Sequence, residues 1–197
     1  MSRTNRLVVL GTRTEVGKTW VGAALVSELR SRGLMVLARK PLQSFDPADP
    51  GPTDAEVLAG ASGEPPTVVC AHHGSFEVPM APPMAADALG RPLPRLAELV
   101  ADLPVEDADL VLVETVGGVM SPLTSDADSA DLARALQPAV PLLVADAGLG
   151  SSTRCVRRAS RSARWSRWCS STASTRHRIF TGATASGWVT MTACGPR

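Results

Sequence analysis

The sequence predicts an α/β fold, in the form of a doubly wound parallel sheet with helices on both faces. Short apolar runs alternate with amphipathic segments along the first 150 residues, and these runs are built mainly from Ala, Val and Leu. Aromatic residues make up only 4% of the 197 residues, so we expect an aliphatic core. Strands covered on both faces need such apolar runs, and this length favours one domain.

The chain opens with an expected strand, loop and helix. Residues 7–10 form an apolar run with two β-branched side chains, and Gly11 ends it. A helical spacing of apolar residues then runs from Lys18 and stops at Gly33. This order places the intervening loop between a strand and the start of a helix.

The later elements continue the alternation. Further strands are expected from short apolar runs at residues 34–38, 109–113 and 140–145. Further helices are expected at residues 54–61, 94–103 and 130–136. Pro94 suits a first helical position, because no amide donor is needed there. This alternation favours a parallel sheet, since each helix returns the chain for another strand in the same direction.

Charge divides the chain near residue 150. All 19 acidic residues precede residue 151, whereas residues 151–197 carry nine Arg and no acid. We therefore expect one α/β domain at 1–150, followed by an irregular or disordered Arg/Ser/Trp-rich segment at 151–197 that is not part of the native fold. We hypothesise that this segment is translated out of frame, which resequencing the coding DNA would decide.

A second interpretation of the segment is a basic arm for nucleic acid. Residues 154–178 carry eight of the nine Arg, and Trp165 and Trp168 are available to stack on bases. No groove or fold accompanies this charge, so the first interpretation is preferred. The Cys spacings in the segment fit no zinc-ligand series.

The sequence also bears on location. No apolar run reaches the roughly 18 to 20 residues that a membrane helix needs. The N-terminus lacks the basic, apolar and small-residue series of a signal peptide. We therefore expect a cytoplasmic protein.

Residues 11–19, GTRTEVGKT, carry the strongest chemical signal. They follow an expected strand and open an expected helix, which is the setting of a phosphate-binding P-loop. Gly17 allows close approach of the backbone to phosphate, Lys18 offsets phosphate charge, and Thr19 can ligate Mg²⁺. The first glycine lies one residue farther out than in the strict motif.

This longer loop resembles that of dethiobiotin synthetases, whose fold is P-loop NTPase-like. Residues 39–44, RKPLQS, resemble the family's Lys-Pro segment. Residues 113–118, VETVGG, resemble its turn after a strand, with Thr115 and Val116 in place of a Gly and an Ala. Residues 77–85 are similar to its proline-rich substrate loop. The resemblance covers residues 1–150.

The resemblance implies roles for individual residues. Those with catalytic counterparts are Lys40, Lys18 and Thr14, and the one with a substrate-binding counterpart is Ser44. Those that match Mg²⁺ ligands are Thr19, Asp54 and Glu114. Those expected to contact ATP are Glu15, Val16, Gly17, Lys18, Thr19, Trp20, Asp54, Glu114, Thr115, Val116 and Gly117.

Two of these residues also fit plainer interpretations. Asp54 suits the cap of its helix, because Asp favours that position. Lys40 suits a solvated lysine at a strand end, although the chain has only two lysines. Glu114 is harder to explain without function, because an unpaired buried carboxylate is costly.

The implied reaction is the ATP-dependent carboxylation and ring closure of 7,8-diaminononanoate with CO₂, which gives dethiobiotin, ADP and phosphate. The implied cofactor is Mg²⁺, with ATP as co-substrate, and the implied assembly is a homodimer. Two alternatives stay open: a partition-type P-loop ATPase switch, and a truncated, non-catalytic remnant. Diamine-dependent ATP hydrolysis would separate the three.

Overall fold

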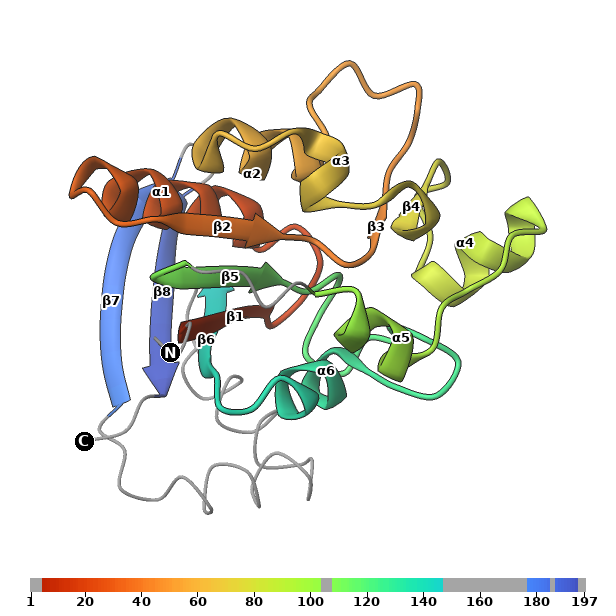
Figure 1. Ribbon diagram of the computed structural model, residues 1–197. Helices are drawn as coiled ribbons and strands as arrows, with labels where there is room; N and C mark the ends of the chain where they lie inside the picture. The colour runs from red at the N-terminus through yellow and green to blue at the C-terminus, as the bar shows by residue number, and fades with distance from the viewer. Residues whose placement is uncertain (1–4, 104–107, 147–176, 185–186, 195–197) are drawn as a thin grey trace.

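The computed structural model describes residues 5–103, 108–146, 177–184 and 187–194 (Figure 1). Its strands are β1 (Asn5–Gly11), β2 (Val36–Arg39), β3 (Gln43–Ser44), β4 (Ser75–Phe76), β5 (Leu110–Glu114), β6 (Val140–Asp146), β7 (His177–Thr184) and β8 (Gly187–Cys194). Its helices are α1 (Lys18–Ser31), α2 (Asp54–Ser62), α3 (Pro66–Val69), α4 (Pro82–Leu89), α5 (Leu96–Ala101) and α6 (Ser129–Ala135), with a 3₁₀ turn η1 (His72–Gly74).

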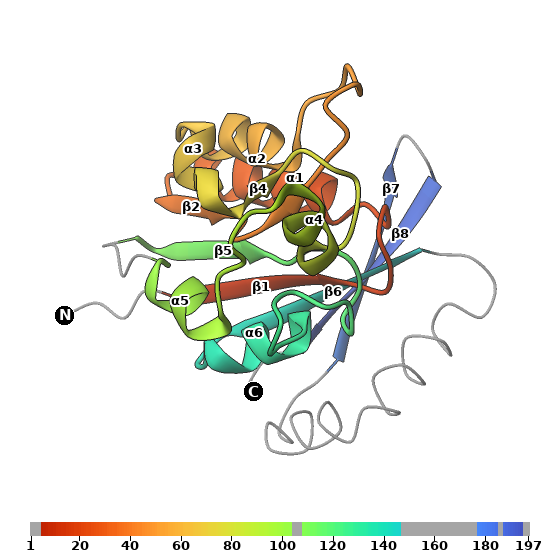
Figure 2. The same cartoon turned by 90° about the vertical axis from the view of Figure 1, so that its right-hand side faces the viewer.

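In the described part of the chain, six strands form one sheet in the order β2-β5-β1-β6-β8-β7. The strands β2, β5, β1 and β6 run parallel. Helices α1, α2 and α3 cover one face of this parallel part, and α5 and α6 cover the other (Figures 1 and 2). The prediction of a doubly wound parallel sheet is therefore confirmed.

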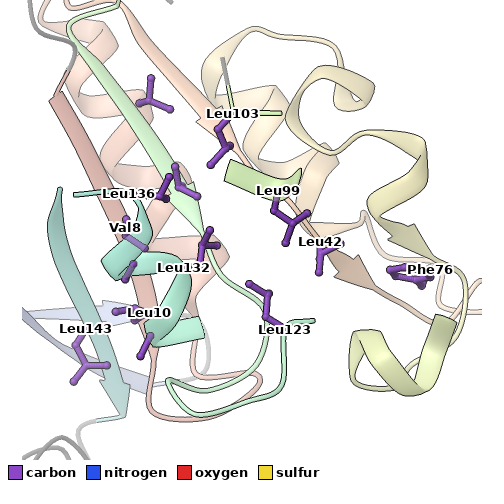
Figure 3. Close-up of a cluster of buried hydrophobic side chains, with 14 of the residues drawn as sticks. Val8, Leu10, Leu42, Phe76, Leu99, Leu103, Leu123, Leu132, Leu136 and Leu143 are labelled. Carbon is purple, nitrogen blue, oxygen red and sulfur yellow. The ribbon is translucent and has the colours of Figure 1, made fainter. Parts of the chain in front are cut away.

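Strand β1 shows why both faces are covered. Val8 and Leu10 point into the cluster that α5 and α6 complete, which Figure 3 shows around Leu132 and Leu136. Val9, between them, packs into the opposite cluster with residues of α1 and α2. Successive side chains of a strand alternate between faces, so a continuous apolar run serves two cores at once.

Two elements differ from the sequence predictions before residue 146. Helix α5 begins at Leu96 with Arg95 as its N-cap, so Pro94 precedes the helix instead of opening it. Helix α4 falls partly within residues 77–85, which were expected to be a proline-rich loop. Pro82 stands in the first turn of α4, where its fixed φ and missing N–H are tolerated.

The C-terminal segment also differs, because an irregular segment was expected and two strands are found. Strands β7 and β8 pair as an antiparallel hairpin, and β8 pairs antiparallel with β6. Both strands contain β-branched and aromatic residues, which favour extended backbone. Strand-helix alternation does not predict these two strands, because a hairpin contains no helix.

Other predictions for this segment stay untested. Residues 147–176, including Trp165 and Trp168, lie outside the described residues. The domain boundary at residue 150 and the out-of-frame hypothesis therefore stay predictions. Among the described helices, none combines the length and apolar character needed to cross a membrane.

Candidate nucleotide and metal site

The loop between β1 and α1 is wound tightly around its own lysine. A Cβ placed at Gly11 would lie 2.8 Å from Cγ1 of Val16 and 2.9 Å from Cδ of Lys18. Gly17 caps α1 with a φ of 90°, a left-handed conformation that favours glycine. In the described structure no side chain caps this helix. Its N-terminus therefore offers main-chain N–H groups and the positive end of the helix dipole to an anion.

Lys18, the first residue of α1, is buried within this loop. Its Nζ donates to the main-chain oxygen of Gly117 at 2.8 Å. Burial, followed by the positive charge of Lys40, lowers the pKa of Lys18 to about 8, against the opposing effects of Glu114 and Asp54. An anion at the loop would favour the protonated amine.

Three oxygen atoms converge beside the loop. Oγ1 of Thr19 lies 2.7 Å from Oδ1 of Asp54 and 2.8 Å from Oε1 of Glu114. A hydroxyl carries one proton, so Thr19 donates to one carboxylate and meets the other with an oxygen lone pair. Such a cluster has more acceptors than donors and needs a cation.

Lys40 supplies a positive charge to this cluster. Its Nζ lies 2.6 Å from both Oε1 of Glu114 and Oδ2 of Asp54. Burial alone would lower the pKa of Lys40, but the two carboxylates outweigh burial and raise the pKa above its ordinary value. The same ammonium lowers the pKa of Asp54, against the opposing effect of burial. Both groups are therefore charged at neutral pH.

The donor set fits Mg²⁺. Glu114 is fully buried at the end of β5, and its Oε2 atom has no hydrogen-bond partner in the described structure. Mg²⁺ binds through one or two carboxylates and completes its shell with water and phosphate oxygens, which matches Asp54, Glu114 and the Thr19 hydroxyl. The described ranges contain no cluster of three or more His, Cys, Asp or Glu side chains suited to a metal.

The plainer interpretation of Asp54 does not match the helix. Thr53 is the N-cap of α2, and its hydroxyl accepts from the N–H of Glu56 in a reciprocal capping box. Asp54 is the first helical residue, and its carboxylate turns to Thr19 and Lys40 instead. Lys40 is 1% exposed, so it is not a solvated strand-end lysine.

Comparisons with known proteins identify relatives of this chain. The family described as "AAA domain" (AAA_26) matches residues 5–161. An ATP-dependent dethiobiotin synthetase BioD of Anaeromyxobacter dehalogenans (strain 2CP-C) is 46% identical over 149 residues, which cover 74% of this chain and 65% of the relative. The BioD protein of Caulobacter vibrioides (strain NA1000 / CB15N) is 41% identical over 152 residues, 75% of this chain and 68% of the relative. The chain belongs to the dethiobiotin synthetase family.

The extent of these matches has limits. The chain spans about two thirds of the length of these dethiobiotin synthetases. The AAA-domain match reaches residue 161, so it continues beyond the boundary expected at 150. Among solved structures, the signal recognition particle receptor FtsY from Elizabethkingia anophelis in complex with GDP has 18% identity and a TM-score of 0.42, over 83% of this chain and 48% of that chain. That similarity is too weak to bear on function.

The turn after β5 accepts the two residues that depart from the dethiobiotin synthetase pattern. Thr115 donates through both its N–H and its hydroxyl to the main-chain oxygen of Val9, at 3.0 and 3.1 Å. Among the described residues other than glycine, only Glu15 has a positive φ, so Thr115 and Val116 need no glycine-like backbone. The left-handed position in this turn is Gly117, where a Cβ would meet Ser121.

The structure gathers part of the predicted site. Lys40, Thr19, Asp54 and Glu114 lie within one network of contacts, and Lys18 is close enough to feel the charges of Lys40, Glu114 and Asp54. The other predicted residues around the loop and turn are Thr14, Glu15, Val16, Gly17, Trp20, Thr115, Val116 and Gly117. Of these, Thr14, Glu15 and Trp20 are exposed, and Val16 and Thr115 are buried.

Ser44 stays a predicted substrate contact. It is half-buried in β3, four residues beyond Lys40, and its Oγ is buried without a hydrogen-bond partner in the described part of the chain. An orphaned hydroxyl of this kind is suited to a ligand, because an unpaired buried polar group is otherwise costly.

Sequence reasoning missed the residues that hold the end of β2. Glu64 accepts from the N–H of Ala38 at 2.9 Å and from Nη1 of Arg39 at 2.6 Å. The N–H of Lys40 donates to the main-chain oxygen of Val69 at 2.7 Å. Glu64, between α2 and α3, and Val69, at the end of α3, therefore fix the backbone that carries Lys40. No local motif marks Glu64, and its partners lie far away in sequence.

Proposed function

We propose that this chain is an ATP-dependent dethiobiotin synthetase that acts on 7,8-diaminononanoate, CO₂ and ATP. The observation that carries the proposal is the placement of a second buried lysine, Lys40, between the carboxylates of Asp54 and Glu114 beside the P-loop threonine. A nucleotide-binding loop alone fits many ATPases. Membership of the dethiobiotin synthetase family supports this particular chemistry.

We propose that the P-loop holds the triphosphate. The N–H groups at the start of α1 would bind phosphate oxygens, and Lys18 would exchange its contact with Gly117 for one with phosphate. Bound Mg²⁺, held by Thr19, Asp54 and Glu114, would offset the charge of the phosphate oxygens. Homodimer formation and a cytoplasmic location belong to the same proposal.

The reaction divides into three substrate steps. One amine of the diamine captures CO₂ and loses a proton, which gives a carbamate. A carbamate oxygen attacks the γ-phosphorus of ATP and displaces ADP. The second amine then attacks the carbamoyl carbon, loses a proton and expels inorganic phosphate, which closes the ureido ring.

The proposed roles of the site residues follow from their charges and positions. Lys18 and Lys40 would offset negative charge on the transferring phosphoryl group and the carbamate, which is the electrostatic contribution that usually dominates such chemistry. Ser44 would bind the diamine. Thr14, which is exposed on the loop, would contact the carbamate.

The test is phosphate release by the purified full chain. We expect release from ATP only when both 7,8-diaminononanoate and bicarbonate are present, together with dethiobiotin detected by mass spectrometry. Lys40→Met should abolish this coupled turnover. Arg32→Met is the matched control, because Arg32 is an exposed cation paired with Glu28 on α1, away from the site.

Two results would count against the proposal. ATP hydrolysis that does not respond to the diamine would indicate a switch-type ATPase. Binding of MgATP without any turnover in the presence of all substrates would indicate a non-catalytic remnant.

A further inference from the structure

Gln43 links three elements around the candidate site. It lies in β3, between Lys40 and Ser44, and is buried. Its side-chain oxygen accepts from the main-chain N–H of Ala55 at 3.0 Å, and its side-chain nitrogen lies 3.0 Å from Oγ of Ser75 in β4. A main-chain N–H can only donate, so this contact fixes which end of the amide faces α2.

The contact with Ala55 lies in the first turn of α2, next to Asp54. Ala55 is the second residue of α2, directly after Asp54, and its N–H belongs to the first turn, where helices lack internal acceptors. Thr53 satisfies the N–H of Glu56 in the same turn. Gln43 is thus a second cap, supplied from outside the helix.

The two carboxylates at the site depend on such support to different degrees. Glu114 is 0% exposed and is carried by a central strand of the sheet. The side chain of Asp54 is 43% exposed and stands at the end of a nine-residue helix. Packing therefore fixes Glu114, whereas Asp54 relies on whatever holds the N-terminus of α2.

We propose that Gln43 is a positioning residue, which acts through Ala55 to hold Asp54 beside Thr19 and Lys40. This hydrogen bond holds α2, which carries Asp54, in a fixed position against the segment that carries Lys40 and Ser44. The proposal rests on the function proposed above, because it assigns Asp54 to Mg²⁺. Residues that orient a metal ligand commonly matter for metal affinity although they never touch the metal.

The test compares nucleotide binding with and without Mg²⁺. Gln43→Met keeps the length of the side chain and removes both hydrogen bonds. We expect the Mg²⁺ concentration for half-maximal enhancement of ATP binding, measured by calorimetry, to rise about 10-fold. ATP affinity measured in EDTA should change by less than about twofold, because the P-loop is untouched.

Thr53→Ala is the matched control. It removes the other cap of the same helix turn but leaves the link to β3 intact. We expect it to lower the melting temperature with little effect on the Mg²⁺ requirement. An equal rise in the Mg²⁺ requirement for Thr53→Ala and Gln43→Met would reduce Gln43 to an ordinary helix cap and overturn the proposal.

A second variant covers the case in which Gln43→Met does not fold. Ser75→Ala removes the partner at the other end of the amide, at a half-buried position. It should raise the Mg²⁺ requirement in the same direction by about threefold, because the amide loses its anchor in β4. An unchanged requirement would contradict the link.

The two proposals fail in different ways. If the proposed function is wrong, the wild-type chain itself will show no Mg²⁺ enhancement of ATP binding or no diamine-dependent turnover. If only the role of Gln43 is wrong, the wild-type chain will show both and the Gln43→Met chain will match its Mg²⁺ requirement.

Discussion

The P-loop and the end of β2 each carry one of the chain's two lysines, and their surroundings are opposite in kind. Lys18 faces a main-chain carbonyl, and burial lowers its pKa to about 8. Lys40 faces two carboxylates, which raise its pKa despite complete burial. The P-loop lysine is thus held ready for an anion that arrives, whereas Lys40 already neutralises anions that belong to the fold.

The largest expected effect is on stability. Lys40→Met leaves the fully buried Glu114 without its ammonium partner, which should lower the free energy of unfolding by about 3 to 5 kcal/mol. Lys18→Met removes a charge that burial disfavours, so it should leave stability unchanged or raise it. Urea denaturation in EDTA measures both.

Added Mg²⁺ should affect the two lysine variants differently. Because Mg²⁺ would supply positive charge to Asp54 and Glu114, it should recover part of the stability lost in Lys40→Met and have less effect on Lys18→Met. Equal losses for the two variants would show that the two lysines do not differ as described.

The next effect concerns nucleotide affinity. Lys18→Met should weaken ATP binding about 10- to 100-fold, which is the loss expected for one charge-assisted contact with phosphate. Calorimetric titration with ATP measures this change. Arg32→Met should bind ATP as the wild type does, and a Lys18→Met chain with undiminished affinity would remove the basis of the proposed site.

The third effect is the pH dependence of that binding. ATP favours protonated Lys18. In the chain without nucleotide the pKa of Lys18 is about 8, so ATP binding above this pH requires the uptake of a proton. Affinity should fall by up to about tenfold per pH unit between about 8 and 10. Lys40 stays charged in this range because its pKa is raised.

Calorimetry in buffers with different ionisation enthalpies measures the proton uptake directly. Lys18→Arg is the matched variant, since arginine keeps its charge throughout this range. It should lose the pH dependence, and a persisting dependence would point to a group other than Lys18.

The smallest effect is expected at the turn after β5. Thr115→Ala removes one hydrogen bond to Val9, whose carbonyl still accepts the main-chain N–H of residue 115. Unfolding free energy should fall by about 1 kcal/mol. ATP affinity should stay within about twofold of wild type, and a larger loss would give the hydroxyl a role in binding.

The sequence was sufficient to predict those parts of the fold and site that depend on residues adjacent in the chain. The strand before Gly11, the P-loop and the start of α1 at Lys18 follow from local patterns, and the structure confirms these elements. Asp54 and Glu114 could be placed at a helix start and a strand end. Their meeting at Thr19 required the parallel order of β1 and β5, which strand-helix alternation only suggests.

The sequence was insufficient where distant side chains cooperate. Gln43 and Glu64 act on backbone groups of other elements, and nothing in their own neighbourhoods indicates it. The antiparallel strands β7 and β8 were missed because a hairpin lacks strand-helix alternation and because β8 pairs with β6, which lies far away in sequence. Likewise, the main-chain N–H of Arg95 donates to the Glu98 carboxylate at the start of α5, a contact that no preference for Pro94 at a first helical position could reveal.

Strand β2 lies at one edge of the sheet, and this position affects how molecules associate. An uncovered strand at the border of a sheet offers its N–H and C=O groups to strands of other molecules, which promotes aggregation. Here Glu64 and the Val69 carbonyl already engage the N–H groups of Ala38 and Lys40. The contacts that orient Lys40 therefore also protect this edge strand from β-pairing with other molecules.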